Sequence, residues 1–330
     1  MIDEGMRTSS GLAVAGETRL AEHDDDDARR TGSLSRASRP VAAPLPPVPE
    51  GICWSTVIGL GIIHVGALFG LVQLVLRPSL NTIVLAVTLY ILCGVSITAG
   101  YHRLFAHRTY RASAPVRWFF LLFGAASFQS SALSWSADHR AHHADTDGPG
   151  DPHAVGKGWW HVHVGWLFHR RQASADVSRL TDLHALRSIR LQHRLDRELA
   201  IGVGLVLPMA IAWLWGDPWG GLLVAGFLRG AIMLQSTFCV NSVAHKIGKP
   251  VYGTDVSARD SVLTAMVTFG EGYHSYHHRF PYDYRNAIRW WQYDPGKWLI
   301  WSLGRVGLVS KERRASAAAI SAARVRVSAT

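Results

Sequence analysis

The sequence predicts an all-α integral membrane protein with four transmembrane helices. Hydrophobic residues make up 48% of its 330 residues and 13 residues are tryptophan, a composition unlike that of an ordinary soluble enzyme. Four long apolar runs are nearly free of charge, and the connections between them are alternately short and long. The long connections hold most of the histidines, so we expect the chemistry of the protein to lie at the membrane edge.

The four apolar runs are each long enough to cross a hydrocarbon core of about 30 Å as a helix. The expected spans are residues 52–76, 80–100, 199–215 and 219–240. Tight turns join the first span to the second and the third to the fourth, so the long segments 101–198 and 241–330 lie on one side of the membrane. Both segments carry more Lys and Arg than Asp and Glu. The positive-inside rule therefore predicts that both segments and both termini are cytoplasmic.

The two ends of the chain differ in composition from the expected domain, residues 50–310. Residues 1–49 are rich in Ser, Arg, Ala and Pro and contain the acidic run "DDDD", so we expect a disordered tail. Residues 311–330 are rich in Ala and Arg and are expected to form a basic tail. The basic residues flank apolar runs and do not lie beside aromatic residues of the kind on which bases stack, which argues against nucleic-acid binding. The three cysteines lie singly in apolar runs, which argues against a disulfide framework and a thiolate metal site.

A repeated histidine spacing is the main chemical signal. The pattern H-x-x-H-H occurs in "HRAHH" at residues 139–143 and again in "HSYHH" at residues 274–278. On a helix, side chains at i, i+3 and i+4 lie on one face, within an arc of about 100°. Each cluster therefore presents three imidazoles that can line one side of a metal site.

Three more histidines lie just beyond expected spans. His102 and His107 follow the second span, and "NSVAH" places Asn241 and His245 after the fourth. On a regular helix His102 and His107 diverge by roughly 140°, so they either serve different metal ions or straddle a helix end. A lone histidine is usually a hydrogen-bonded side chain, but nine of them at membrane edges indicate a metal centre.

The kind of donor limits the kind of metal. Imidazole suits zinc, copper, iron and nickel. A structural zinc ion needs only four ligands, whereas nine imidazoles supply two ions with four or five each and leave positions open. We therefore favour a pair of redox-active metal ions, with iron as the best candidate.

Several segments in the same order resemble one enzyme family. They are "TAGYHRLFAHRTYRA", "WSADHRAHH", "DPH", "HVGWLF", "FLRGAIMLQSTFCVNSVAH" and "GEGYHSYHHRFPYDYR", and they fall between residues 80 and 290. Together they resemble the membrane acyl-CoA desaturases of the stearoyl-CoA desaturase type. The resemblance implies four spans under a cytosolic helical cap that holds a histidine-ligated diiron centre.

The resemblance also implies a metal-ligand set. The iron ligands would be His102, His107, His139, His142, His143, His245, His274, His277 and His278. Asn241 would reach an iron ion through a water molecule. No separate acid or base residue is expected besides the diiron centre.

A bent tunnel for an acyl chain is a further implication of the resemblance. Gln129, Trp135 and Thr237 match the residues at its kink. Its closed end, in the second span, matches Tyr90 and Gly94. These two residues lie at i and i+4 on one face, so a bulky Tyr90 would limit the depth available to the substrate.

The activity implied by the resemblance is the O₂-dependent insertion of a cis double bond, at carbon 9, into a saturated C16–C18 acyl chain. The expected carrier is CoA, with another acyl thioester or lipid as the alternative, because the residues that grip CoA cannot be matched individually. Electrons would come from a separate protein of the ferredoxin or cytochrome b5 type with its reductase. The alternatives are a related diiron hydroxylase or alkane monooxygenase and, from another class, a metal transporter or haem-binding membrane protein. Arg229, a charge within the fourth span, has no assigned role.

Overall fold

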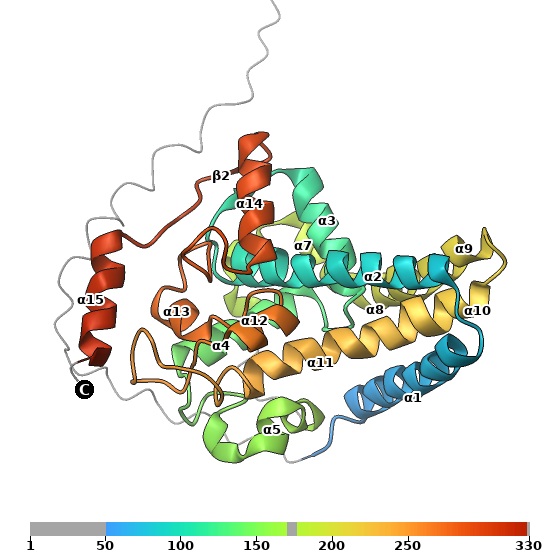
Figure 1. The fold of residues 1–330 in the computed structure, drawn as a ribbon, viewed down its shortest axis with the longest axis horizontal. Coiled ribbons are helices and arrows are strands. Elements are labelled where there is room, and N and C mark those ends of the chain that lie inside the picture. Colours follow the sequence, from blue (N-terminus) through green and yellow to red (C-terminus); the bar gives the residue numbers. More distant parts are fainter. Residues whose placement is uncertain (1–50, 170–176, 329–330) are drawn as a thin grey trace, which may run out of the picture. The chain divides into compact units, whose positions relative to one another are not determined.

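A computed structural model describes residues 51–169 and 177–328. The expected disordered tail, residues 1–49, lies outside the described residues. Within the described part the protein is helical, with one short two-stranded sheet (Figure 1).

The first two expected spans form a helical hairpin. Helix α1 (Trp54–Leu76) is followed by α2 (Leu80–Val95), which continues as the π-helical segment η1 (Ser96–Ala106). Ser79 begins α2 because its hydroxyl accepts a hydrogen bond from the Thr82 backbone N–H. Along α1 the exposed side chains are apolar, among them Leu68 and Phe69, which suits a surface in contact with lipid.

The third and fourth expected spans form a second hairpin. The third consists of α8 (Asp196–Ile201), η6 (Gly202–Val206) and α9 (Leu207–Trp213). The fourth consists of α10 (Pro218–Gly220), η7 (Gly221–Leu228) and α11 (Arg229–Ser242). Asp217, in the turn between them, caps α10 and accepts a hydrogen bond of 2.5 Å from the Thr82 hydroxyl at the start of α2. The turns of the two hairpins are thereby joined.

Three described helices are long and apolar enough to cross a membrane. They are Trp54–Leu76, Leu80–Ala106 and Pro218–Ser242. The expected third span, residues 199–215, is helical as far as Trp213, but the helix that contains it begins with the charged residues 196–198. Its role as a span therefore stays a prediction.

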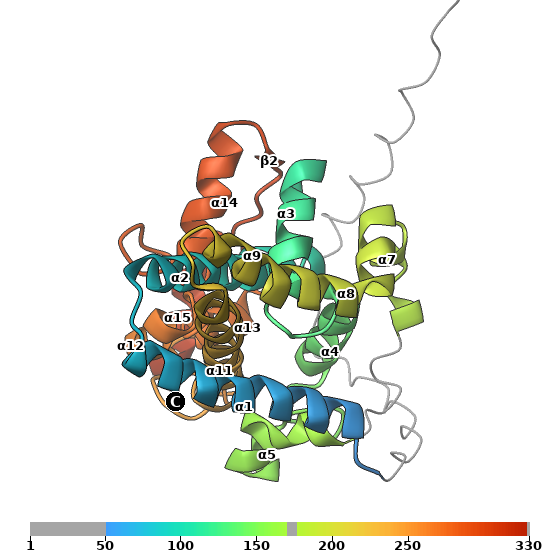
Figure 2. The same cartoon turned by 90° about the vertical axis from the view of Figure 1, so that its right-hand side faces the viewer.

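The remaining elements lie mostly at one end of the hairpins, opposite the turns that join α1 to α2 and α9 to α10 (Figures 1 and 2). The α-helices are α3 (Ala114–Ala125), α4 (Ala132–Ala144), α5 (Trp159–His163), α6 (Thr181–His184), α7 (Arg187–Arg194), α12 (Val262–Val267), α13 (His274–Arg279), α14 (Pro295–Arg305) and α15 (Ala317–Ser328). The 3₁₀ turns are η2 (Val155–Lys157), η3 (Gly165–Phe168) and η5 (Val177–Arg179). Strand β1 (Arg111–Ala112) pairs antiparallel with β2 (Val309–Ser310), and Arg111 lies opposite Ser310.

The main hydrophobic core lies where η1 meets α3, α4, α7 and α14. Tyr101, Phe105, Phe120 and Leu133 are almost completely buried there. A side chain in place of Gly124 would meet the Tyr101 ring at 2.2 Å, so η1 and α3 approach closely only because this residue is glycine. This packing positions the histidine that follows Tyr101 in the chain.

The C-terminal segment packs on the rest of the domain. The sequence places residues 311–330 outside the domain, but Ile320 and Ala323 of α15 are buried beside Tyr252 and Phe280. Folded packing therefore continues well beyond residue 310.

Candidate metal centre

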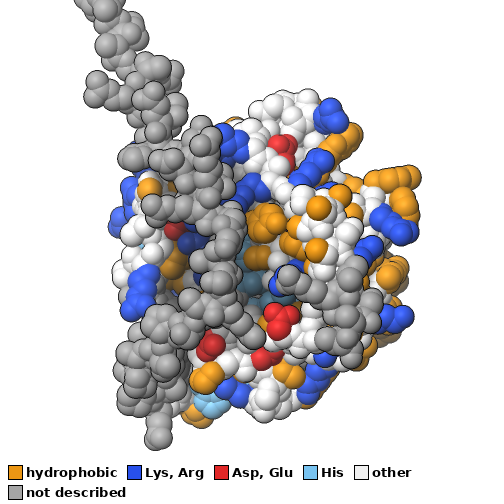
Figure 3. All heavy atoms as spheres, turned by 90° about the vertical axis from the view of Figure 1, so that its left-hand side faces the viewer, with side chains coloured by type: hydrophobic (Ala, Val, Ile, Leu, Met, Phe, Trp, Pro, Cys, Tyr) orange, Lys and Arg blue, Asp and Glu red, His pale blue; other side chains and the backbone are white. Residues whose placement is uncertain are grey.

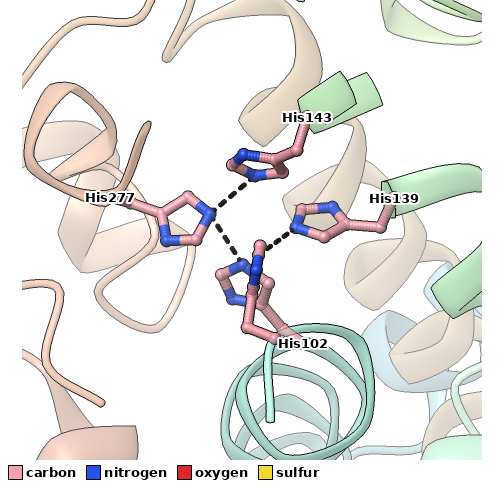
Figure 4. A group of neighbouring side chains, drawn as sticks. His102, His139, His143 and His277 are labelled. Carbon is pink, nitrogen blue, oxygen red and sulfur yellow. Dashed lines mark hydrogen bonds between the residues drawn. The ribbon is translucent and has the colours of Figure 1, made fainter. Parts of the chain in front are cut away.

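The nine histidines singled out by their spacing come together as two groups. The first group is His102, His107, His139, His143 and His277, and the second is His142, His245, His274 and His278. In each group one nitrogen from every ring lies within 4.8 Å of the others. Figure 4 shows four members of the first group, whose rings point toward one another from η1, α4 and α13.

Each H-x-x-H-H cluster contributes to both groups. On α4 the i and i+4 side chains, His139 and His143, belong to the first group and His142 belongs to the second. On α13 the arrangement is reversed, because only His277 belongs to the first group. The two helices therefore bridge two sites. The spacing alone suggested that each cluster faces one metal site, whereas each cluster contributes to both.

The π-helical geometry of η1 explains how His102 and His107 meet. In a π-helix the hydrogen bond runs from residue i+5 back to residue i, so these two positions lie above one another. The His107 backbone N–H donates to the His102 carbonyl at 3.0 Å, and the ring centroids are 4.9 Å apart. Of the two alternatives left by the sequence, the structure has the pair at a helix end and in the same group.

The spacing of the nitrogen atoms fits a bound metal ion. In the first group the Nε2 of His277 is 3.0 Å from that of His102 and 2.9 Å from that of His143. In the second group the Nε2 of His274 is 3.0 Å from that of His245 and 3.1 Å from that of His278. Ligand atoms about 2.1 Å from a metal and at right angles are about 3.0 Å apart. Both groups therefore have the geometry of preformed ligand sets.

Carboxylates lie on the outer nitrogen of two of these rings. The Nδ1 of His102 is 3.0 Å from Glu271 Oε2, and the Nδ1 of His142 is 2.9 Å from Asp151 Oδ1. A carboxylate there favours a proton on Nδ1 and so leaves the Nε2 lone pair facing the centre of the group. His245 is oriented in a similar way by a 2.7 Å hydrogen bond between its Nδ1 and the Ser257 hydroxyl.

Both carboxylates stay ionised in this setting. Their pKa values are lowered although burial acts in the opposite direction: the hydrogen bond from His142 lowers the pKa of the Asp151 carboxyl to about 2, and His102 and the Arg103 guanidinium beside it lower the pKa of Glu271. Each carboxylate therefore keeps a negative charge beside a histidine of the centre.

Seven of the nine histidines are held in the neutral form that binds metals. Burial, reinforced by the neighbouring imidazoles, lowers the pKa of His107, His139, His143, His245, His277 and His278 well below its ordinary value, and that of His274 to about 3. Neutral rings whose lone pairs face one another repel, and a cation between them removes that repulsion.

Sequence reasoning did not single out Asp151, Ser257 or Glu271 as partners of the histidines. Glu271 lies just before the histidines of residues 274–278 in the chain, whereas in the structure its side chain contacts His102 and Arg103. The motif "DPH" was the available signal for Asp151, because an acidic residue shortly after histidines is a common outer partner of a metal ligand.

An outer cavity of about 700 Å³ reaches the metal centre from the side of α1 and α8. The three residues expected at the tunnel kink, Gln129, Trp135 and Thr237, all line it. The Gln129 amide donates to the Thr237 hydroxyl at 2.9 Å, and the Trp135 indole N–H donates to the Gln129 carbonyl oxygen at 3.3 Å. Because the Trp135 ring stacks on His139 with centroids 4.8 Å apart, this hydrogen-bonded triad lies directly beside the first histidine group.

An inner cavity of about 50 Å³ shares Trp135 and Thr237 with the outer one and is also lined by histidines of both groups. Asn241 lines both cavities, and Gly94 lines the inner one. Tyr90 does not line the inner cavity. It packs behind the ring of Phe269, which does line it, with ring centroids 5.1 Å apart.

Arg229, at the start of α11, is buried and binds backbone carbonyls. Its guanidinium donates to Ala126 at 2.6 Å, to Gly204 at 2.9 Å and to Ala225 at 3.0 Å. It also lies over the ring of Phe128, 5.4 Å from the centroid. One side chain thus joins η6, η7 and the turn after α3 that leads into the kink.

Fold and site together define a helical membrane protein with a buried, histidine-lined metal centre. The sequence profile of the fatty acid desaturase family matches residues 80–306. The chain is 35% identical to stearoyl-CoA desaturase 2 of Mus musculus over 281 residues, which are 83% of this chain and 78% of the mouse protein. The chain belongs to the fatty acid desaturase family.

Two fungal proteins are similar over a shorter part of their own length. Acyl-CoA desaturase 1 of Saccharomyces cerevisiae is 44% identical over 252 residues, 75% of this chain and 49% of the yeast protein. A probable acyl-CoA desaturase of Schizosaccharomyces pombe is also 44% identical, over 69% of this chain and 48% of that protein. The chain therefore spans about half the length of these two relatives.

Proposed function

We propose that this protein is an O₂-dependent acyl-CoA desaturase that inserts a cis double bond at carbon 9 of saturated C16–C18 acyl chains. The observation that carries the proposal is the position of the hydrogen-bonded triad of Gln129, Trp135 and Thr237 between two cavities and against the first histidine group. Family membership supports the reaction, and the similarity to an acyl-CoA desaturase and a stearoyl-CoA desaturase supports acyl-CoA as the substrate.

The nine histidines would hold two iron ions. Five histidines of the first group would surround one ion, and four histidines of the second group would surround the other. Asn241 would complete the second set through a water molecule. When bound, the iron pair supplies the activation of O₂ with two external electrons. The all-imidazole donor set and the Nε2 spacing near 3 Å agree with this cofactor.

The cavity walls supply selectivity. All methylenes of a saturated chain are chemically alike, so only a fixed position beside the metal centre distinguishes one pair from the next. A chain in the outer cavity that turns at the triad passes the Trp135 ring, which is stacked on His139. The bend favours the chain conformation that leads to a cis double bond.

The metal centre and both termini are proposed to be cytoplasmic. Basic side chains are more widespread than acidic ones on the face at the end of the molecule that carries α13 and α15 (Figure 3), in agreement with the positive-inside rule. The electrons would come from a separate ferredoxin or cytochrome b5 type protein with its reductase. Protease accessibility of a C-terminal tag in sealed inverted vesicles tests this topology, and protection of the tag would contradict it.

The activity is tested with membranes that contain the protein, supplied with iron, O₂, a reducing system and stearoyl-CoA or palmitoyl-CoA. We expect a cis alkene at carbon 9, located by mass spectrometry of the released fatty acids. An alcohol would instead support a diiron hydroxylase. Chains that stay fully saturated, as in control membranes without the protein, would refute the proposal.

A further inference from the structure

The inner cavity ends at an aromatic side chain from the loop between α12 and α13. Phe269 is 5% exposed and lines this cavity together with Gly94 and Met233. Its ring packs in a hydrophobic cluster that includes Cys93 and Ala126. The ring therefore forms a wall between the inner cavity and this hydrophobic cluster.

The Phe269 ring and Gly94 are complementary in shape. A Cβ atom built on Gly94 would lie 2.2 Å from Phe269 Cζ, much closer than real carbon atoms approach. The Phe269 ring occupies the space that a side chain at position 94 of α2 would take. Tyr90, one turn earlier on α2, packs against the same ring with centroids 5.1 Å apart and does not line the cavity.

The backbone fixes the position of this ring relative to the metal centre. Phe269 has φ = 54° and Gly270 has φ = 92°, both in the left-handed region that is sparsely populated for residues with a side chain. Two residues after Phe269, Glu271 lies 3.0 Å from the Nδ1 of His102. The same short loop therefore holds an outer partner of a metal ligand and the end of the cavity.

We propose that Phe269 is the specificity-determining wall of the acyl tunnel and sets the longest chain that the tunnel accepts. This inference rests on the proposed function, since it assigns the end of the same tunnel. Tyr90 acts only through Phe269, by supporting the back of its ring.

The first experiment measures chain-length preference in membranes with an equimolar mixture of C14 to C20 acyl-CoA. Phe269→Ala should raise the product ratio of C20 to C16 by on the order of tenfold over wild type, because a hydrophobic pocket discriminates by about this factor or more per methylene. Phe269→Leu should give an intermediate ratio, and neither replacement is β-branched, so the left-handed backbone is not strained further.

Two further variants make the readout specific. Phe119→Leu removes a ring that packs on the same cluster but does not line the cavity, so its ratio should equal that of wild type. Tyr90→Ala should shift the ratio less than Phe269→Ala. An unchanged ratio in Phe269→Ala, or a larger shift in Tyr90→Ala, would overturn the inference.

A rescue experiment uses the shape match directly. Gly94→Ala should lower turnover of C18 relative to C16, because the added methyl group displaces the ring into the tunnel. Gly94→Ala combined with Phe269→Ala should restore C18 turnover, because the displaced ring is absent. A double variant no better than Gly94→Ala alone would contradict the assignment.

A binding measurement separates this inference from the proposed reaction. Thermal stabilisation of the detergent-purified protein by saturated acyl-CoA should rise with chain length until the tunnel is full and then stop rising. The chain length at this break should be greater in Phe269→Ala than in wild type. Wild type that binds these chains but forms no alkene would refute only the reaction, whereas identical breaks, or no stabilisation by any chain, would refute the role of Phe269.

Discussion

At the scale of single residues, the carboxylates behind the histidines matter as much as the histidines. Asp151 is 1% exposed and lies 2.9 Å from the Nδ1 of His142, a ring of the second group. Its negative charge holds the proton on Nδ1 and makes Nε2 a better ligand. Loss of that charge should therefore act on one of the two metal sites.

Replacement of Asp151 by Asn should weaken metal binding at the second group by about 10- to 100-fold. The measurement is iron per chain after titration with a chelator, which should remove about half of the metal much earlier than in wild type. Asp145→Asn is the matched control, because Asp145 is exposed and bonds only the nearby loop backbone. Equal chelator curves for Asp151→Asn and wild type would argue against this role.

The lowered histidine pKa values predict acid sensitivity of the iron-free protein. The pKa of His274 and of His153 is about 3 in the folded protein, against about 6.5 in an unfolded chain. Below pH 6.5 the unfolded chain therefore binds protons that the folded protein does not, so stability is complete above this pH and is lost as the pH falls from about 6.5 toward 3.

Each such histidine changes the free energy of unfolding by up to about 1.4 kcal/mol per pH unit in this range. Melting temperatures of chelator-treated protein in detergent at pH 7.5, 6.0 and 5.0 should fall steeply. The fall should be shallower in His153→Gln, because one of the groups responsible is removed. A melting temperature that stays constant across these pH values would count against buried neutral histidines.

At the scale of elements, one arginine joins segments that the chain order keeps apart. Arg229 on α11 donates to carbonyls of the turn after α3, of η6 and of η7. The turn after α3 leads to Gln129, which is flanked by Phe128 and Ser130, both with positive φ. This unfavourable backbone persists because its surroundings hold it.

Arg229→Met should lower the melting temperature clearly more than Arg229→Lys, because it removes the charged donor that three carbonyls share, at about 1–3 kcal/mol for each hydrogen bond lost. Activity should fall as well, since the kink is no longer held in place. Arg305→Met is a suitable control, because Arg305 is exposed and stacks on Trp301 at the surface. Similar melting temperatures for Met and Lys at position 229 would show that the carbonyls do not need this cation.

At the scale of the whole molecule, membrane insertion and chemistry depend on different parts of the chain. The apolar helices α1, α2 and α11 decide insertion through their hydrophobic surface. The metal-facing side chains come largely from α4 and α13, which lie at one end of these helices (Figure 1). The two properties should therefore be separable by mutation.

His142→Ala should abolish activity and reduce bound iron while membrane insertion stays at the wild-type level. Product analysis, iron content and carbonate extraction of membranes measure the three properties. His161→Ala is the control, because His161 bonds the Pro152 carbonyl and belongs to neither histidine group. Turnover retained in His142→Ala would show that this histidine is not a ligand.

The sequence by itself determined the helical membrane class and singled out the nine histidines that the structure brings together. These features follow from apolar run length and from histidine spacing, which depend only on residues close together in the chain. The same local reasoning left two alternatives open for His102 and His107, because it used regular α geometry, and the π-helical segment that ends at this pair decides between them.

The tertiary structure alone decided which histidines share a site, that Glu271 contacts His102, and that Phe269 and not Tyr90 borders the inner cavity. Each of these facts is a contact between segments far apart in the sequence, such as α2 with the loop after α12. Such contacts depend on how side-chain volumes fit between packed helices, and the empty place at Gly94 is filled by a ring that no local pattern connects with it.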